Sequence, residues 1–91
     1  MDCAVEANAE ITNRFGLHLG PATIVAKTAM RFRSKIWIVS GDKAVSARSV
    51  VEMTSLGARS GTQLKIRAEG PDAEDALRAV RLLFQTGFGE E

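Results

Sequence analysis

The single histidine of the chain, His18, lies at the junction of a loop and a helix, within the segment Gly16-Leu17-His18-Leu19-Gly20-Pro21-Ala22. Pro21 lacks an N–H and fits a helix only in its first turn, so the helix must begin just after His18. The backbone amides of Leu19 and Gly20 are then available, and the positive end of the helix dipole lies beside the ring. An imidazole nitrogen next to such an anion site can attack a phosphoryl group and hold it.

The same position also suits a histidine without any chemistry. A surface histidine that only caps the helix would show the same spacing in the sequence. Position and spacing alone therefore leave both interpretations of His18 open.

The elements that position His18 follow from the periodicity of the apolar residues. Alternation predicts strands at residues 5–11, 35–39, 43–47 and 63–69, and helical spacing predicts helices at 19–31, 50–56 and 73–84, with Gly87 as the final stop. Because helices are missing between several consecutive strands, the order βαββαβα favours one antiparallel sheet with all three helices on one face. The expected fold is an open-faced β-sandwich of the α+β class.

The second of these helices has a start signal of its own. Ser49-Val50-Val51-Glu52 matches a capping box, in which the serine hydroxyl accepts from the Glu52 amide and the Glu52 carboxylate reaches back to the Ser49 N–H.

Length and composition exclude several classes of protein. With 91 residues, 45% hydrophobic and 25% charged, the chain suits a single folded domain over residues 1–91 and excludes a large multi-step enzyme. The net charge of +1 gives no strong field for nucleic acid. Trp37 is the one aromatic expected on the open sheet face, whereas base stacking would call for two or three. The polar residues expected on that face are Glu6, Asn8, Lys65 and Arg67.

No bound cofactor, metal ion or membrane insertion is expected. One histidine and one cysteine, Cys3, cannot supply the three or four ligands of a usual metal site, and no internal disulfide can form. Apolar stretches such as residues 36–39 are far shorter than a bilayer span, and the N-terminus lacks the pattern of a signal peptide. We expect a cytoplasmic protein.

The sequence resembles a known family across nearly its whole length. Gly16-Leu17-His18 followed by Pro21-Ala22-Thr23 resembles the active-site signature of the HPr family, the histidine phosphocarriers of the phosphoenolpyruvate-dependent sugar phosphotransferase system (PTS). Further similar segments are Lys27-Thr28-Ala29 with Phe32, Ser49 through Ser55-Leu56-Gly57, and residues 70–77. The fold of the family, an open-faced β-sandwich of βαββαβα order, agrees with the fold expected from periodicity.

The resemblance implies a relay of phosphoryl groups between proteins. The PTS first enzyme would pass the group to Nδ1 of His18, and the carrier would hand it to a sugar-specific acceptor domain. The backbone amides of Leu19 and Gly20 would bind the phosphate. Leu17, Leu19 and Phe15 would either dock these partner enzymes or pack in the core. A carrier that meets both partners through one surface is expected to be a monomer.

The chain departs from the family pattern at Gly20, where the family has an arginine two residues after the histidine. A charge-assisted hydrogen bond contributes roughly 1.5–3 kcal/mol, so its loss would slow transfer unless another cation replaces it. Arg14 is the nearest candidate for that cation. Alternatively, the chain is a regulatory paralogue with altered or lost phosphotransfer, acting as a protein-interaction module through the surface around Leu19, Ser49 and Met53.

Ser49 has two competing interpretations. It aligns with the serine that a dedicated kinase phosphorylates in HPr from some bacteria, which makes a serine kinase a further expected partner. It also serves as the capping residue described above. A stand-alone enzyme is not expected, because Glu10 and Asn13 form no persuasive acid–base pair with His18.

Overall fold

The computed structural model describes residues 3–89, and it confirms the predicted order of strands and helices. The elements are β1 (Cys3–Glu10), α1 (Leu19–Ala29), β2 (Lys35–Ser40), β3 (Lys43–Ser46), α2 (Val50–Ser55), β4 (Gln63–Gly70), α3 (Ala73–Gln85) and a short 3₁₀ turn, η1 (Gly87–Gly89).

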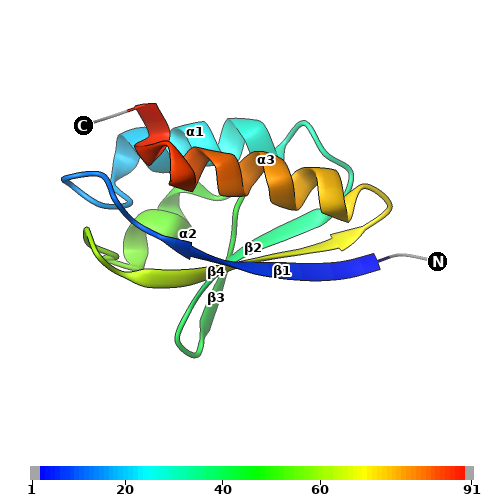
Figure 1. Cartoon of the computed structure of the whole chain (residues 1–91), viewed down its shortest axis with the longest axis horizontal. Helices are drawn as coiled ribbons and strands as arrows, with labels where there is room; N and C mark the ends of the chain where they lie inside the picture. The colour runs from blue at the N-terminus through cyan, green and yellow to red at the C-terminus, as the bar shows by residue number, and fades with distance from the viewer. Residues whose placement is uncertain (1–2, 90–91) are drawn as a thin grey trace.

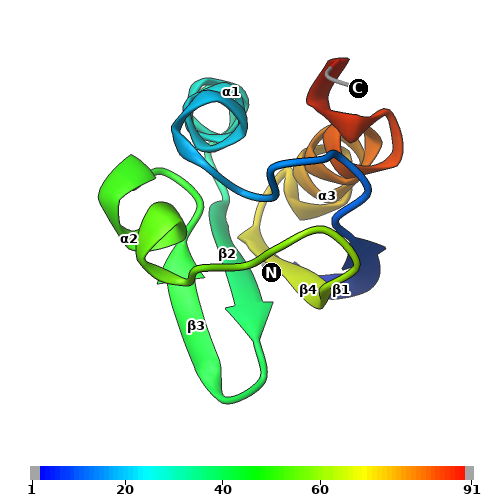
Figure 2. The same ribbon diagram turned by 90° about the vertical axis from the view of Figure 1, so that its left-hand side faces the viewer.

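The four strands form one antiparallel sheet in the order β1-β4-β2-β3. Helices α1 and α3 lie next to each other over one face of this sheet (Figure 1). The end-on view shows α2 beside α1 and close to β3, with the opposite face of the sheet left uncovered (Figure 2). The predicted open-faced α+β fold is therefore confirmed.

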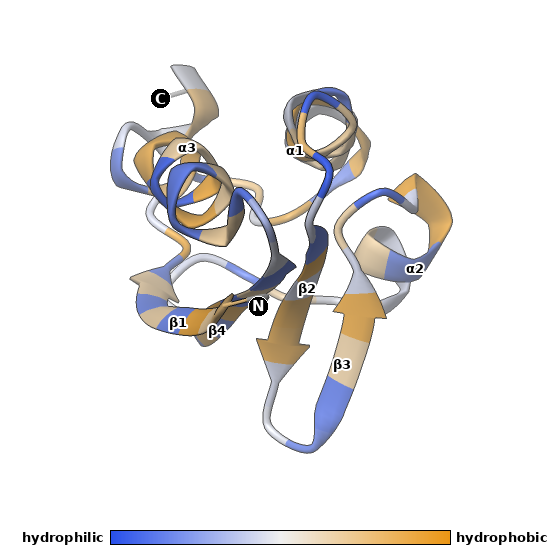
Figure 3. Ribbon diagram, turned by 90° about the vertical axis from the view of Figure 1, so that its right-hand side faces the viewer, coloured by the Kyte–Doolittle hydropathy of each residue, from blue (hydrophilic) through white to orange (hydrophobic). Residues whose placement is uncertain are grey.

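The core lies between the sheet and the helices. Strand β4 alternates strictly, with Leu64, Ile66 and Ala68 buried and the intervening residues exposed. Across from it, the predicted apolar stripe of α1 is buried along its length, from Ala22 to Ala29. In Figure 3 the hydrophobic colour predominates along β2, the helices carry both colours, and the tip of the β2–β3 hairpin is hydrophilic. None of the helices within residues 3–89 has the length and apolarity needed to span a bilayer.

The uncovered face of the sheet carries paired charges. Glu6 lies 4.0 Å from Lys65 and 3.6 Å from Arg67, and Arg67 lies 3.1 Å from Glu69. Trp37 is half-buried and faces Arg67 across the β2–β4 ladder. Opposite charges therefore lie next to one another over this face.

Helix α1 ends at Ala29 rather than at Arg31 as predicted. The amides of Arg31 and Phe32 bond to the carbonyls three residues before them, so the chain leaves the helix through a tightened turn. Arg48 then fixes the following segment, because one of its guanidinium nitrogens donates to the carbonyls of Phe32 at 2.6 Å and Ser34 at 3.0 Å.

The described chain ends in a left-handed turn that folds back onto the body of the molecule. Phe88 has a φ of 59°, a conformation that costs an L-residue about 1–2 kcal/mol. Its ring is 5% exposed and packs against Phe84 at a centroid distance of 4.8 Å, which offsets that cost. A Cβ on Gly87 would lie 3.6 Å from Thr12 Oγ1 and 3.9 Å from Asn13 Cβ. This terminal turn therefore packs beside the loop that leads to His18.

Candidate functional site

His18 is the N-cap of α1. Its backbone is extended, with φ −84° and ψ −170°, and its Nδ1 atom accepts a hydrogen bond from the Gly20 N–H at 3.3 Å. The side chain is half-buried, so one part of the ring stays open to solvent. An accepting Nδ1 carries the lone pair of the ring, and this lone pair faces the first turn of the helix.

The first turn of α1 presents two backbone amides. Pro21 has none, and the Ala22 N–H already donates to the His18 carbonyl at 3.0 Å. The amides of Leu19 and Gly20 lie before the first N–H that donates within the helix, so no helix carbonyl accepts from them, and the Gly20 N–H donates to His18 Nδ1 instead. Both residues are exposed. The first turn of α1 also contains no acidic residue, so no carboxylate of this turn offsets the helix dipole.

A tightly bonded loop brings the chain to His18. The Asn13 side-chain amide donates to the Gly16 carbonyl at 2.7 Å, and the Leu17 N–H donates to the Ala58 carbonyl at 3.0 Å. Gly16 has a φ of +74°, and a Cβ there would lie 2.3 Å from the Ala58 oxygen. Only glycine meets both conditions, which is why the chain can pass this closely to the loop after α2.

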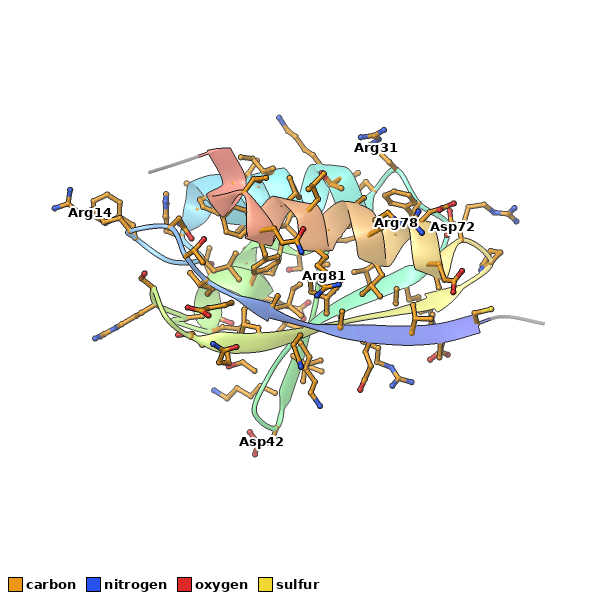
Figure 4. The ribbon with its side chains drawn as sticks, viewed as in Figure 1. Arg14, Arg31, Asp42, Asp72, Arg78 and Arg81 are labelled. Carbon is orange, nitrogen blue, oxygen red and sulfur yellow. The ribbon has the colours of Figure 1, made fainter. Side chains whose placement is uncertain are left out.

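Within this loop, Phe15 contacts both His18 and Arg14. The rings of Phe15 and His18 meet edge to face, with centroids 6.1 Å apart and planes at 86°. The guanidinium carbon of Arg14 lies 5.3 Å from the centroid of the Phe15 ring. Figure 4 shows Arg14 extending away from the body of the molecule. A contact between Arg14 and a phosphoryl group stays a prediction.

The apolar residues expected to dock partners divide into two groups. Phe15 and Leu19 are 71% and 66% exposed, whereas Leu17 is 3% exposed and packs in the core, which was the competing interpretation. Met53, predicted to be part of an interaction surface, is fully buried and belongs to the core as well. That prediction is wrong because Met53 lies on the inner face of α2, while the outer face carries Val51, 77% exposed.

Ser49 caps α2, but the capping box is only half formed. The Ser49 hydroxyl accepts from the Glu52 N–H at 3.1 Å, as predicted. The Glu52 carboxylate instead accepts from the Ser46 N–H at 3.2 Å, while the Ser49 N–H donates to the Ser46 carbonyl at 3.1 Å. The predicted return bond from Glu52 to Ser49 is wrong because a turn from Ser46 to Ser49 already uses that amide.

Sequence reasoning named Phe15 only as a docking or core residue, and it missed the contributions of Asn13 and Ala58 to the loop. Asn13 next to a turn glycine is a recognisable local signal, because asparagine side chains often bond to nearby backbone groups. The contact with Ala58 has no such signal, since it joins segments that are distant in the chain. Among residues 3–89, no three potential metal ligands of the His, Cys, Asp or Glu type lie together.

Comparison with known proteins assigns the family. Residues 5–86 match the family model described as "PTS HPr component phosphorylation site". The chain is 40% identical over 81 residues to the phosphocarrier protein HPr of Treponema pallidum, covering 89% of this chain and 92% of that one. It is 38% identical over 87 residues to the multiphosphoryl transfer protein of Vibrio cholerae, covering 92% of this chain and 22% of that protein.

A solved structure agrees over almost the full length. The crystal structure of HPr-C-His from Thermoanaerobacter tengcongensis superposes with a TM-score of 0.91 at 41% identity, covering 96% of this chain and 98% of that one. The HPr from Bacillus anthracis gives a TM-score of 0.86 at 32% identity, with 91% and 99% of the two chains covered. The chain therefore belongs to the HPr family, the phosphocarriers of the phosphotransferase system, whose place in a phosphoryl relay implies enzyme partners.

Proposed function

We propose that His18 is the phosphoryl-carrying residue and that its Nδ1 atom receives the group from the PTS first enzyme and passes it to a sugar-specific acceptor domain. The observation that carries this proposal is the hydrogen bond from the Gly20 N–H to Nδ1 at 3.3 Å. It aims the reactive lone pair at the helix terminus where a phosphoryl oxygen would be stabilised.

The transfer needs no reactant other than the phosphoryl donor and the carrier. The lone pair of Nδ1 forms the N–P bond, the bond between phosphorus and the donor breaks, and its electron pair leaves with the donor. The Gly20 N–H, released from Nδ1, then donates to a phosphoryl oxygen. At 3.3 Å its bond to the ring is long, so breaking it costs little. The second transfer reverses these steps toward the acceptor.

Both partner enzymes would dock on the same surface around His18. Phe15, Leu19 and Val51 are strongly exposed apolar side chains on the loop, α1 and α2, and α1 and α2 pack against each other. A single domain acting as a monomer in the cytoplasm would suffice for this exchange. Neither nucleic acid nor a membrane would take part.

The amides of Leu19 and Gly20 would bind the phosphate, and Arg14 would replace the cation that the family has at the position of Gly20. Arg14 is exposed and on the same loop, so its guanidinium can leave the Phe15 face when a dianion appears. We expect Arg14→Ala to accept phosphate about tenfold more slowly and Arg14→Lys to recover part of the rate. Arg81→Ala, on α3, is the matched control. An unaltered rate for Arg14→Ala would exclude this role.

The decisive experiment measures acid-labile phosphate incorporated from phosphoenolpyruvate in the presence of the first enzyme. His18→Ala should incorporate none, while losing only about 0.5–2 kcal/mol of stability as a removed helix cap. Ser49→Ala removes the cap of α2 in the same way and should keep full incorporation. Phosphate retained by His18→Ala, or none taken up by wild type alongside a standard HPr, would refute the proposal.

A regulatory interaction module is the second candidate, and Gly20 is the observation that favours it. In that case transfer would be altered or lost, and the exposed surface around Leu19, Ser49 and Val51 would bind a partner protein. His18→Ala would then bind that partner as well as wild type does. A partner whose binding is lost with the imidazole would exclude this candidate.

Ser49 is the proposed site of regulation by a serine kinase. A phosphoryl group there would face the amides of α2 but also the Glu52 carboxylate, so its effects on the helix oppose each other. The test incubates the chain with a purified kinase that modifies a standard HPr, and compares wild type with Ser49→Ala. Modification lost in Ser49→Ala would support the site, and an unmodified wild type would count against it.

A further inference from the structure

The side chain of Phe15 is more exposed than expected of a residue that only supports the fold. It is 71% exposed and is not part of the core cluster. Single exposed apolar residues are common on protein surfaces. Phe15 differs from them because its ring contacts both the His18 imidazole and the Arg14 guanidinium.

The backbone under Phe15 is held on both sides. The Gly16 N–H donates to the Asn13 carbonyl at 3.3 Å, and the Gly16 carbonyl accepts from the Asn13 side chain at 2.7 Å. One residue further on, Leu17 is fastened to Ala58. The backbone that carries Phe15 is therefore held in place, and from it the ring reaches His18.

Rotation of the imidazole would exchange the places of Nδ1 and Nε2. The bond from the Gly20 N–H to Nδ1 is long, at 3.3 Å, and by itself restrains this rotation only weakly. An edge-to-face aromatic contact restricts this rotation, because it favours one relative orientation of the two rings. Phe15 supplies that contact at a centroid distance of 6.1 Å and an interplanar angle of 86°.

We propose that Phe15 is a positioning residue for phosphotransfer: its ring keeps Nδ1 of His18 directed at the first turn of α1, and its face holds the Arg14 guanidinium near the site. This inference rests on the function proposed above. In a chain that has Gly20 where the family has arginine, one aromatic side chain would thus serve both the nucleophile and the substitute cation.

The experiment compares Phe15→Leu with Phe15→Tyr, which keeps the ring. In the unphosphorylated protein, the NMR shifts of the carbon-bound ring protons of His18 should move in Phe15→Leu and stay near wild type in Phe15→Tyr. Phosphate acceptance should slow about two- to tenfold in Phe15→Leu and recover in Phe15→Tyr. Leu82→Ala, an exposed apolar residue of α3, is the control for surface loss and should change neither quantity.

A double variant tests the link to Arg14. If Phe15 holds the guanidinium, Arg14→Ala should slow transfer less in the Phe15→Leu background than in wild type. Fully additive effects would overturn that half of the proposal.

Other outcomes separate positioning from docking. A residue that only docks the partners would raise the KM for the first enzyme at unchanged kcat and leave the imidazole shifts unaltered. Either unaltered shifts or failed rescue by tyrosine would overturn the proposal. If wild type accepts no phosphate, the proposed function fails, while the imidazole shifts still decide whether Phe15 orients the ring.

Discussion

The N-termini of α1 and α3 differ in charge and in hydrogen bonding. Both helices begin beside the same sheet, and both carry a partial positive charge at their start. At α3, the first turn contains Glu74 and Asp75, and the N-cap is Asp72. At α1, the first turn contains no acidic residue, and the N-cap is an imidazole that accepts a hydrogen bond from the turn itself.

At the N-terminus of α3, Asp72 bonds to a distant segment of the chain. Its carboxylate accepts from the Ser34 hydroxyl at 2.6 Å, the Ser34 N–H at 2.8 Å and the Arg33 N–H at 2.9 Å, instead of from an amide of its own helix. The Ser34 hydroxyl and the Arg33 amide lower the pKa of Asp72 from 3.8 to about 2. The start of α3 thus ties the α1–β2 connection to β4, whereas at the start of α1 the Gly20 N–H donates to the side chain of the N-cap itself.

The largest expected effect comes from breaking the loop that presents α1. Gly16→Ala would place a Cβ 2.3 Å from the Ala58 oxygen and 2.9 Å from Arg59 Cα at a φ of +74°. We expect a loss of about 2–5 kcal/mol in unfolding free energy and a matching collapse of phosphate acceptance. Gly57→Ala is the matched control, since Gly57 has a similar φ of +63° with nothing within 4 Å. Its cost should stay near 1 kcal/mol, and equal costs for the two variants would contradict the role of the close approach.

A carboxylate introduced at Gly20 would give the first turn of α1 the negative charge found in the first turn of α3, and its expected effect is smaller than that of Gly16→Ala. Gly20→Glu should slow phosphate acceptance at least about tenfold, because a carboxylate would occupy the positive end of the helix and repel the phosphoryl group. Gly20→Arg should do the reverse and speed acceptance, by less than about tenfold because Arg14 already supplies a cation. Gly20→Gln adds a side chain as long as that of glutamate but without its charge, so comparing it with Gly20→Glu separates the effect of charge from the effect of length. If all three variants react alike, the electrostatic contrast between the two helices has no bearing on transfer.

The third change tests α3 and should leave phosphate acceptance unaltered. Because the pKa of Asp72 is lowered on folding, its ionised form stabilises the protein fully above about pH 4, and this contribution is lost as pH falls toward about 2. Asp72→Asn should therefore unfold at a lower temperature than wild type at pH 7, with the difference shrinking to near zero at pH 2. Melting curves between pH 7 and 2 measure this, and a difference that stays constant would rule out the carboxylate as its source.

Local patterns were sufficient to predict most of the fold. Alternation in β4 and helical spacing in α1 directly reflect which side of each element is buried, so Ile66 and Val25 could be assigned to the core from sequence. His18 could be placed at the start of α1 because Pro21 restricts where a helix begins.

Contacts between distant segments could not be predicted. The bond from Ser34 to Asp72 joins residues 38 positions apart, and the bond from the Ser46 N–H to the Glu52 carboxylate joins the end of β3 to α2. Phe88 takes a left-handed conformation that its residue type disfavours, because burial against Phe84 outweighs the local preference. The contacts of Phe15 with Arg14 and His18 likewise depend on the shape of their loop, which is bonded to the Ala58 carbonyl through the Leu17 N–H.

The paired charges on the uncovered face of the sheet have a consequence for the kinetics of encounter. Glu6, Lys65, Arg67 and Glu69 neutralise one another at short range, so this face projects little potential beyond the Debye length of about 8 Å at physiological salt. A partner approaching by diffusion receives little guidance from it. Long-range steering is therefore left to charges elsewhere on the molecule, and removing both members of an ion pair on this face should leave the ionic-strength dependence of the association rate close to that of wild type.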